Sequence, residues 1–157
     1  MKNSHLLPLL LLSVLISCSK KEEAPTLDNL LRFQNQNYSF LDTREGKDNE
    51  FIISEYKQRN SRLYFVSPTK EMNMFLFSEK YKKTFEDLGL EVYSLGDEHI
   101  GYDEHSIVYI VPAKSGKSLV VFLAVKTAEY PTKHEQATAF LNELKNLTPV
   151  ANPQKEK

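Results

Sequence analysis

The chain has little cysteine, glycine or tryptophan: its 157 residues include one cysteine, five glycines and no tryptophan. A single cysteine excludes a disulfide within the chain. A phosphate-binding P-loop is also excluded, because "KSGKS" at 114–118 has Val111 where such a loop needs its first glycine, and a strand-like run follows it. We therefore expect the fold to be stabilised by its hydrophobic core.

The chain also lacks an excess of charge of either sign, since it has 20 basic and 21 acidic residues and a formal net charge of −1. Such a balance gives no reason to expect nucleic acid as a partner or broad attraction to anionic lipid. The N-terminal apolar run, residues 6–16, is about half of the ~20 residues that a membrane-spanning helix needs. With Lys2 before it, this run is typical of a secretory signal peptide.

The end of that run carries the most specific motif in the chain. Leu15-Ile16-Ser17-Cys18 resembles the lipobox of bacterial lipoproteins, with leucine at −3, a small residue at −1 and cysteine at +1. The resemblance implies a signal peptide at residues 1–17, cleavage after Ser17, and acylation of the Cys18 thiol and of the new α-amine. Several acyl chains hold a protein on a membrane far better than one, so Cys18 is expected to be a lipid anchor.

Two consequences follow for the exported chain. Acylation of Cys18 leaves no thiol for a disulfide, a zinc site or a nucleophile. Residues 18–25, "CSKKEEAP", are predicted to be a lipidated, flexible tether. By the lipoprotein sorting rule, Ser19 after the cysteine implies the outer membrane, on its periplasmic face or at the cell surface. The predicted partner is thus the membrane itself, through the N-terminal lipid.

Apolar periodicity predicts two main helices, at 68–88 and at 132–147. The first begins with Ser67-Pro68, a favoured start, and ends at Gly89. Its expected buried stripe includes residues at three- and four-residue steps, widened near the N-terminus by three more apolar residues; these are Met74, Phe77, Tyr81, Phe85 and Leu88, with Met72, Phe75 and Leu76. A short helix is predicted at 26–35, and residues 148–157 are predicted to be a disordered tail.

Between the helices, five short runs rich in β-branched and aromatic residues predict strands. They lie at 50–56, 62–67, 90–95, 106–112 and 118–126, and a weaker sixth lies at 38–42. The runs at 106–112 and 118–126 are almost continuously apolar, which is typical of central strands covered on both faces. We therefore expect one α+β domain at 26–147, with two or three layers and a mostly antiparallel sheet of five to six strands.

The stretch "GDEHIGYDEH" at 96–105 contains two identical Asp-Glu-His triplets. Imidazole nitrogens and carboxylate oxygens are suitable ligands for zinc, copper or nickel. If the loop folds back at Gly101, His99, His105, Asp97 and Asp103 could hold one divalent metal ion. The alternative is a hydrophilic loop between two strands, with its charges simply solvated.

No nucleophile-elbow or other hydrolase motif is present, and small tethered domains of this kind more often bind than catalyse. The sequence therefore favours a membrane-anchored envelope lipoprotein that acts as a non-catalytic binding or assembly module, with another envelope protein as a candidate partner. The alternative is a metal-binding protein or a hydrolytic enzyme that uses the His99 and His105 loop. Metal apart, no cofactor is expected.

Overall fold

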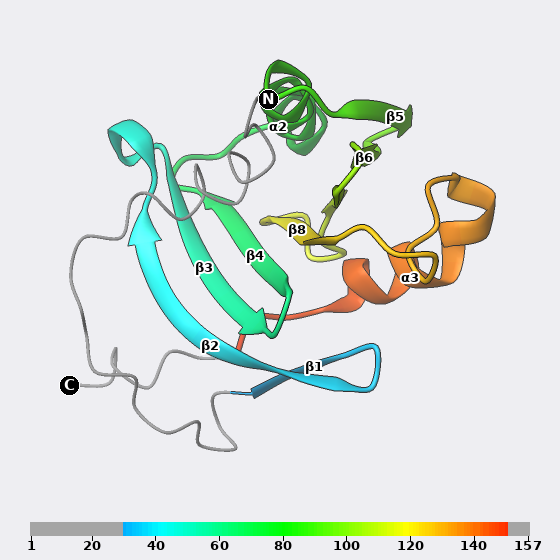
Figure 1. Cartoon of the computed structure of the whole chain (residues 1–157). Helices are drawn as coiled ribbons and strands as arrows, with labels where there is room; N and C mark the ends of the chain where they lie inside the picture. Colours follow the sequence, from blue (N-terminus) through cyan, green and yellow to red (C-terminus); the bar gives the residue numbers. More distant parts are fainter. Residues whose placement is uncertain (1–29, 151–157) are drawn as a thin grey trace, which may run out of the picture.

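The computed structural model describes residues 30–150, which form one eight-stranded sheet with a helix on each face (Figure 1). The elements, in chain order, are β1 Leu30–Phe33, β2 Gln36–Glu45, a 3-10 turn Lys47–Asn49, β3 Phe51–Gln58, β4 Ser61–Pro68, α2 Met74–Asp87, β5 Glu91–Leu95, β6 Glu98–Tyr102, β7 Ser106–Pro112, β8 Leu119–Val125 and α3 His134–Asn146.

The sheet consists of two antiparallel meanders joined side by side. Its strand order is β1-β2-β3-β4-β8-β7-β6-β5, and every neighbouring pair is antiparallel. Consecutive strands pair within β1–β4 and within β5–β8, and β4 pairs with β8 to join the two halves. The prediction of an α+β domain with an antiparallel sheet and two main helices is confirmed, but the sheet has eight strands rather than five or six.

One of the unexpected strands replaces the predicted N-terminal helix. Residues Leu30–Phe33 form β1, and the other part of that prediction, residues 26–29, lies outside the described residues. Leu31 and Phe33 are buried whereas Arg32 between them is exposed, which is the period-two pattern of a strand with one buried face. In so short a segment, adjacent leucines fit a helical and a strand pattern equally well, so the periodicity was ambiguous.

The other unexpected strand lies inside the predicted 96–105 loop. Gly96 has a positive φ of 62°, and with Asp97 it makes a two-residue turn of the II′ kind between β5 and β6. Residues Glu98–Tyr102 then form β6, which pairs with both β5 and β7. The charged residues of this segment predicted a loop, but it is a strand in which His99, Ile100 and Gly101 are all buried.

Both predicted helices exist but start later than their sequence signals. Strand β4 continues through Pro68, so α2 begins only at Met74, where the Asn73 side chain accepts hydrogen bonds from the backbone N–H groups of Phe75 and Leu76 at 2.9 and 3.3 Å. The C-terminal end is as predicted, with Gly89 at φ 93°. Helix α3 begins at His134, two residues after Thr132.

The core has two separate halves, one on each face of the sheet. Alternate residues of β7 divide between them: Ile107, Tyr109 and Val111 face α3, whereas Val108 and Ile110 face α2. Strands β7 and β8 are buried on both faces, as their apolar runs predicted. The fold is therefore a three-layer α/β/α arrangement.

The buried stripe of α2 is confirmed at Phe77, Tyr81 and Phe85, but its predicted widening is wrong. Phe75 is 50% exposed, and Met72 and Leu76 are exposed as well. Phe75 and Leu76 lie in the first turn of α2, and Met72 lies just before it. Neither helix of residues 30–150 has the length and apolar character required to cross a membrane.

Candidate functional site

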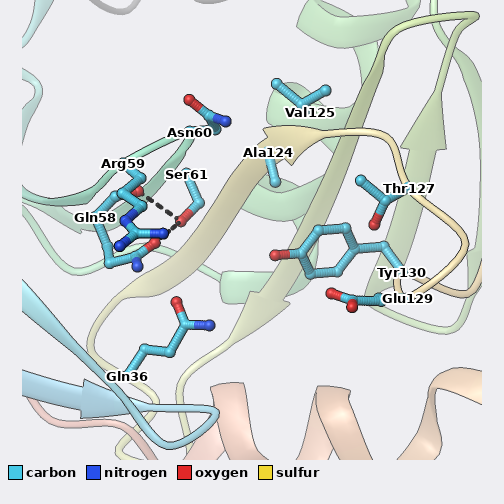
Figure 2. Close-up of a pocket in the computed structure, with 10 residues that line it drawn as sticks. All are labelled: Gln36, Gln58, Arg59, Asn60, Ser61, Ala124, Val125, Thr127, Glu129 and Tyr130. Atoms are coloured by element: carbon cyan, nitrogen blue, oxygen red, sulfur yellow. Dashed lines mark hydrogen bonds between the residues drawn. The ribbon is translucent and has the colours of Figure 1, made fainter.

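A polar hollow of about 230 Å³ lies where the β3–β4 turn approaches the loop between β8 and α3 (Figure 2). Amide, hydroxyl and charged groups lie in its wall beside apolar side-chain surface; the lining residues are Gln36, Gln58, Arg59, Asn60, Ser61, Ala124, Val125, Thr127, Glu129 and Tyr130. We call this site the polar hollow.

The turn side of the polar hollow is held by hydrogen bonds. The Ser61 hydroxyl donates to the Gln58 carbonyl at 3.0 Å, and it lies 2.9 Å from the Tyr38 hydroxyl in the core. Arg59 adopts a positive φ of 37°, which allows the two-residue turn to close. The Val125 N–H donates to the Asn60 carbonyl at 3.4 Å and so joins the turn to the end of β8.

The opposite side of the polar hollow is built on Tyr130. Its ring packs against Phe122 and Phe140 at centroid distances of 5.5 and 6.0 Å, so its position is fixed by the core. Burial raises the pKa of the Tyr130 hydroxyl, which stays neutral at physiological pH. The hydroxyl points into the hollow, as does the amide of Gln36 (Figure 2).

These groups suit a neutral ligand. Carboxamides and hydroxyls each present both donors and acceptors, which matches a ligand whose own groups do the same. Arg59 and Glu129 contribute one charge of each sign, so the lining has no net charge. The hollow thus offers hydrogen bonds to a small molecule rich in hydroxyl or amide groups, with an aromatic edge at one side.

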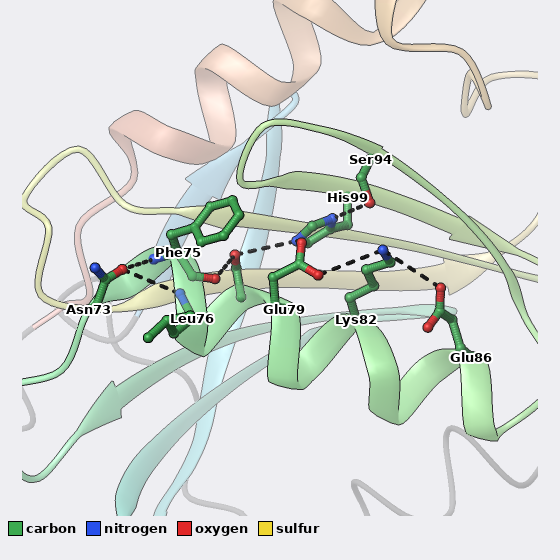
Figure 3. A network of polar contacts seen from close by, with 9 residues as sticks. Asn73, Phe75, Leu76, Glu79, Lys82, Glu86, Ser94 and His99 are labelled. Atoms are coloured by element: carbon green, nitrogen blue, oxygen red, sulfur yellow. Dashed lines mark hydrogen bonds and ion pairs between the residues drawn. The ribbon is translucent and has the colours of Figure 1, made fainter.

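A second polar feature is a hydrogen-bonded chain around His99, beneath α2 (Figure 3). The imidazole is completely buried. Its Nδ1 lies 2.7 Å from the Ser94 hydroxyl on β5, and its Nε2 lies 3.3 Å from the Ser78 hydroxyl on α2. The Glu79 carboxylate is 3.6 Å from Nε2.

The hydrogen bonds define the tautomer of this imidazole. Ser78 donates its proton to the Phe75 carbonyl at 2.8 Å, so its oxygen accepts from His99 Nε2–H. Nδ1 therefore carries the lone pair that accepts from the Ser94 hydroxyl. Burial lowers the pKa of His99; Lys82 and His134 act in the same direction, and Glu79 and Asp97 oppose them.

The order Ser94, His99, Glu79 resembles a nucleophile, a base and a carboxylate. The chemistry is nevertheless unfavourable, because a completely buried imidazole with a lowered pKa is a weak base and the ion formed on proton transfer would be poorly solvated. Both ring nitrogens already have protein partners. The arrangement is best explained as a structural clamp that joins β5, β6 and α2.

The four predicted metal ligands are not brought together. His99 is buried on the α2 face of β6, whereas His105 is exposed in the turn beyond the other end of that strand. Asp97 lies in the β5–β6 turn, and Asp103 uses its carboxylate to accept from the N–H groups of His105 and Ser106 at 2.7 and 2.6 Å. Among residues 30–150, no group of three or more His, Cys, Asp or Glu side chains is placed to hold a metal ion. Metal binding stays a prediction.

A buried carboxylate forms the remaining charged cluster. Glu55 on β3 accepts from Arg44 at 2.7 Å and lies 3.4 Å from both Arg62 and the Tyr64 hydroxyl. All four side chains come from adjacent strands, and the arginines neutralise the carboxylate inside the sheet layer. We interpret this cluster as structural.

The predicted lipidation site, Cys18, lies outside the described residues, and the polar hollow was missed from the sequence altogether. Its residues come from three separate segments (36, 58–61 and 124–130) with no common motif, and only the fold brings them together. No protein-family model matches the chain, and neither a curated protein nor a solved structure matches it significantly.

Proposed function

We propose that the protein is a lipid-anchored binding module of the bacterial cell envelope, acylated at Cys18 and located at the outer membrane. In this proposal the polar hollow takes a small neutral ligand rich in hydroxyl groups, such as a saccharide. The observation that carries the binding part is the lining of the hollow: three carboxamides, three hydroxyls and one charge of each sign. The lipobox-like Leu15-Ile16-Ser17-Cys18 supports the anchor.

The anchor is tested on protein expressed in a bacterial host. We expect the intact mass of the membrane-bound protein to correspond to a chain that begins at Cys18 and carries acyl groups. The Cys18→Ala variant should accumulate as an uncleaved precursor or as soluble protein. A mature form without lipid that begins at another residue would refute the anchor.

The ligand class is tested separately, by NMR titration with glucose, N-acetylglucosamine and their short oligomers. Gln36→Ala removes one amide from the polar hollow, and Gln136→Ala removes an amide that is also exposed, on α3, as the matched control. We expect shifts at hollow residues that weaken in Gln36→Ala and persist in Gln136→Ala. If saccharides perturb none of these residues, or if both variants respond alike, the proposed ligand class is wrong.

The alternative function is hydrolysis, and the 2.7 Å contact of Ser94 with His99 is the observation in its favour. A fluorophosphonate probe reacts with activated serines. Labelling that is lost in Ser94→Ala and kept in Ser115→Ala, an exposed serine in the β7–β8 turn, would establish this alternative. Because the imidazole is a buried weak base, we expect no Ser94-dependent labelling.

A further inference from the structure

Strand β5 is the last strand of the sheet, and its outer side has no partner strand among residues 30–150. Its pairing with β6 is regular, from Glu91↔Tyr102 to Leu95↔Glu98, without a bulge. A regular edge presents unpaired backbone donors and acceptors to any extended chain that approaches it.

The register identifies which backbone groups point outward. In a two-residue hairpin the residues that flank the turn, here Leu95 and Glu98, form a hydrogen-bonded pair. The pairs then alternate, so Ser94↔His99 and Val92↔Gly101 are non-hydrogen-bonded pairs. The N–H and C=O groups of Val92 and Ser94 therefore face away from the sheet. Their separation is that of one hydrogen-bonded repeat in an antiparallel ladder.

The side chains of β5 favour a further strand as well. Tyr93 and Leu95 lie on the face of the sheet that α3 covers elsewhere, and they are 50% and 62% exposed. Tyr93 stacks on Tyr102 of β6 with ring centroids 5.8 Å apart, which holds it in place. The strand contains neither proline nor lysine, two of the devices that commonly protect an edge.

Charge distinguishes between possible occupants of this edge. Glu91 lies on the same face as Tyr93 and Leu95, and no cationic group of residues 30–150 forms an ion pair with it. If β5 of a second copy paired antiparallel with β5 along all of Glu91–Leu95, Glu91 would lie opposite Leu95 of the other copy. The carboxylate would then have no counter-charge. Once the proposed signal peptide is removed, the chain's own segments outside the described residues are 19–29 and 151–157, and both lack a pair of large apolar residues at alternate positions.

We propose that β5 binds an extended segment of another protein by strand addition, with the backbone of that segment hydrogen-bonded to Val92 and Ser94. The segment carries a cationic residue opposite Glu91 and apolar residues opposite Tyr93 and Leu95. Main-chain hydrogen bonds supply the affinity in this mode of recognition, and the alternate side chains supply the specificity. The site uses none of the residues of the polar hollow, and only the exclusion of residues 1–18 as its occupant rests on the proposed function.

The probe is a fluorescein-labelled peptide, Val-Thr-Val-Thr-Lys, which places lysine opposite Glu91 in an antiparallel arrangement. Its binding to the full-length chain in mild detergent is measured by fluorescence polarisation. Val92→Pro removes one outward N–H, and Val92→Thr is the matched control that keeps it. We expect binding about tenfold weaker or worse in Val92→Pro, as the loss of a hydrogen bond plus a steric block implies, and little change in Val92→Thr.

A charge exchange tests the proposal without any change to the backbone. Glu91→Lys should weaken binding of the lysine peptide by about threefold, as expected for an exposed ion pair, and should strengthen binding of the same peptide with glutamate in place of lysine. Equal binding by Val92→Pro and Val92→Thr, no binding by the wild type, or no effect of the exchange would overturn the proposal. Light scattering that shows a dimer broken by Val92→Pro would assign the edge to a second copy and would overturn it as well.

Discussion

Phe140 on α3 provides the sharpest test of the three-layer core. Its side chain is 8% exposed, and its ring contacts four other aromatic rings contributed by β1, β7, β8 and the loop before α3. The centroid distances are 4.6 Å to Tyr109, 5.0 Å to Phe33, 5.3 Å to Phe122 and 6.0 Å to Tyr130. Phe140→Ala therefore removes the central ring of the cluster that attaches α3 to the sheet.

The expected loss follows from these contacts. Phenylalanine to alanine in a core costs about 3–5 kcal/mol of unfolding free energy, from lost transfer energy and from the cavity left behind. Each aromatic pair is worth about 0.5–1.5 kcal/mol beyond burial, so with four pairs we expect a value in the upper half of that range. A domain in the middle or upper part of the usual range of about 5–15 kcal/mol stays folded after such a loss, so equilibrium measurement is feasible there.

The assay is urea denaturation followed by circular dichroism, with Phe75→Ala as the matched control. Phe75 is also a helical phenylalanine, but it is 50% exposed at the start of α2, so we expect its replacement to change stability by no more than about 0.5 kcal/mol. If Phe140→Ala costs less than about 1.5 kcal/mol, or if the two variants lose the same amount, the assignment of Phe140 to the core and of Phe75 to the surface is wrong.

Three further predictions concern the β5–β6 hairpin. Burial lowers the pKa of His99 in the folded protein. Between pH 6.5 and that lowered pKa, the unfolded chain binds more protons than the folded one. The unfolding free energy should therefore fall as pH decreases through this window, by up to about 1.4 kcal/mol per pH unit. Denaturation at several pH values should show a smaller slope in His99→Gln; the same slope in both proteins would contradict the structure. Gly101→Ala places a methyl group 2.9 Å from Val108 Cγ1 and should cost about 1–3 kcal/mol in the same assay, whereas no loss would argue against this packing. Zinc and copper should bind the wild type and the His99→Ala/His105→Ala variant equally and weakly by calorimetry, and metal binding lost in the double variant would establish the predicted site instead.

The sequence predicted the long elements well because their patterns are unambiguous. The continuous apolar runs of β7 and β8 are short and rich in β-branched residues, which favours strands covered on both faces, and the three- and four-residue steps of α2 and α3 are typical of amphipathic helices. The exposure of Phe75 was not predictable, because local spacing alone places it beside the buried stripe. Its exposure depends on whether the sheet extends beneath the first turn of α2, and only the tertiary structure decides that.

The short elements failed for a different reason. Strand β1 has four residues and β6 has five, so neither is long enough to display a distinctive period. In β6 the charged residues suggested a solvated loop, although His99 is satisfied by Ser94 and Ser78, and Glu98 pairs with Lys145 of α3. Of these partners, Ser78 and Lys145 lie far away in the sequence, on the two helices. The polar hollow could not be predicted from the sequence either, since its lining residues meet only after the β4–β8 pairing has formed.

The joining of the two meanders through β4 and β8 has a consequence for how the chain folds. Every other strand pairing connects consecutive strands through short turns, which close at low entropic cost. The β4–β8 ladder, from Ser61↔Ala124 to Val66↔Leu119, joins residues more than about fifty positions apart and encloses α2, β5, β6 and β7. Formation of this one ladder should therefore limit the folding rate, and destabilising changes along it should slow folding, whereas those at β1 or β5 should mainly speed unfolding.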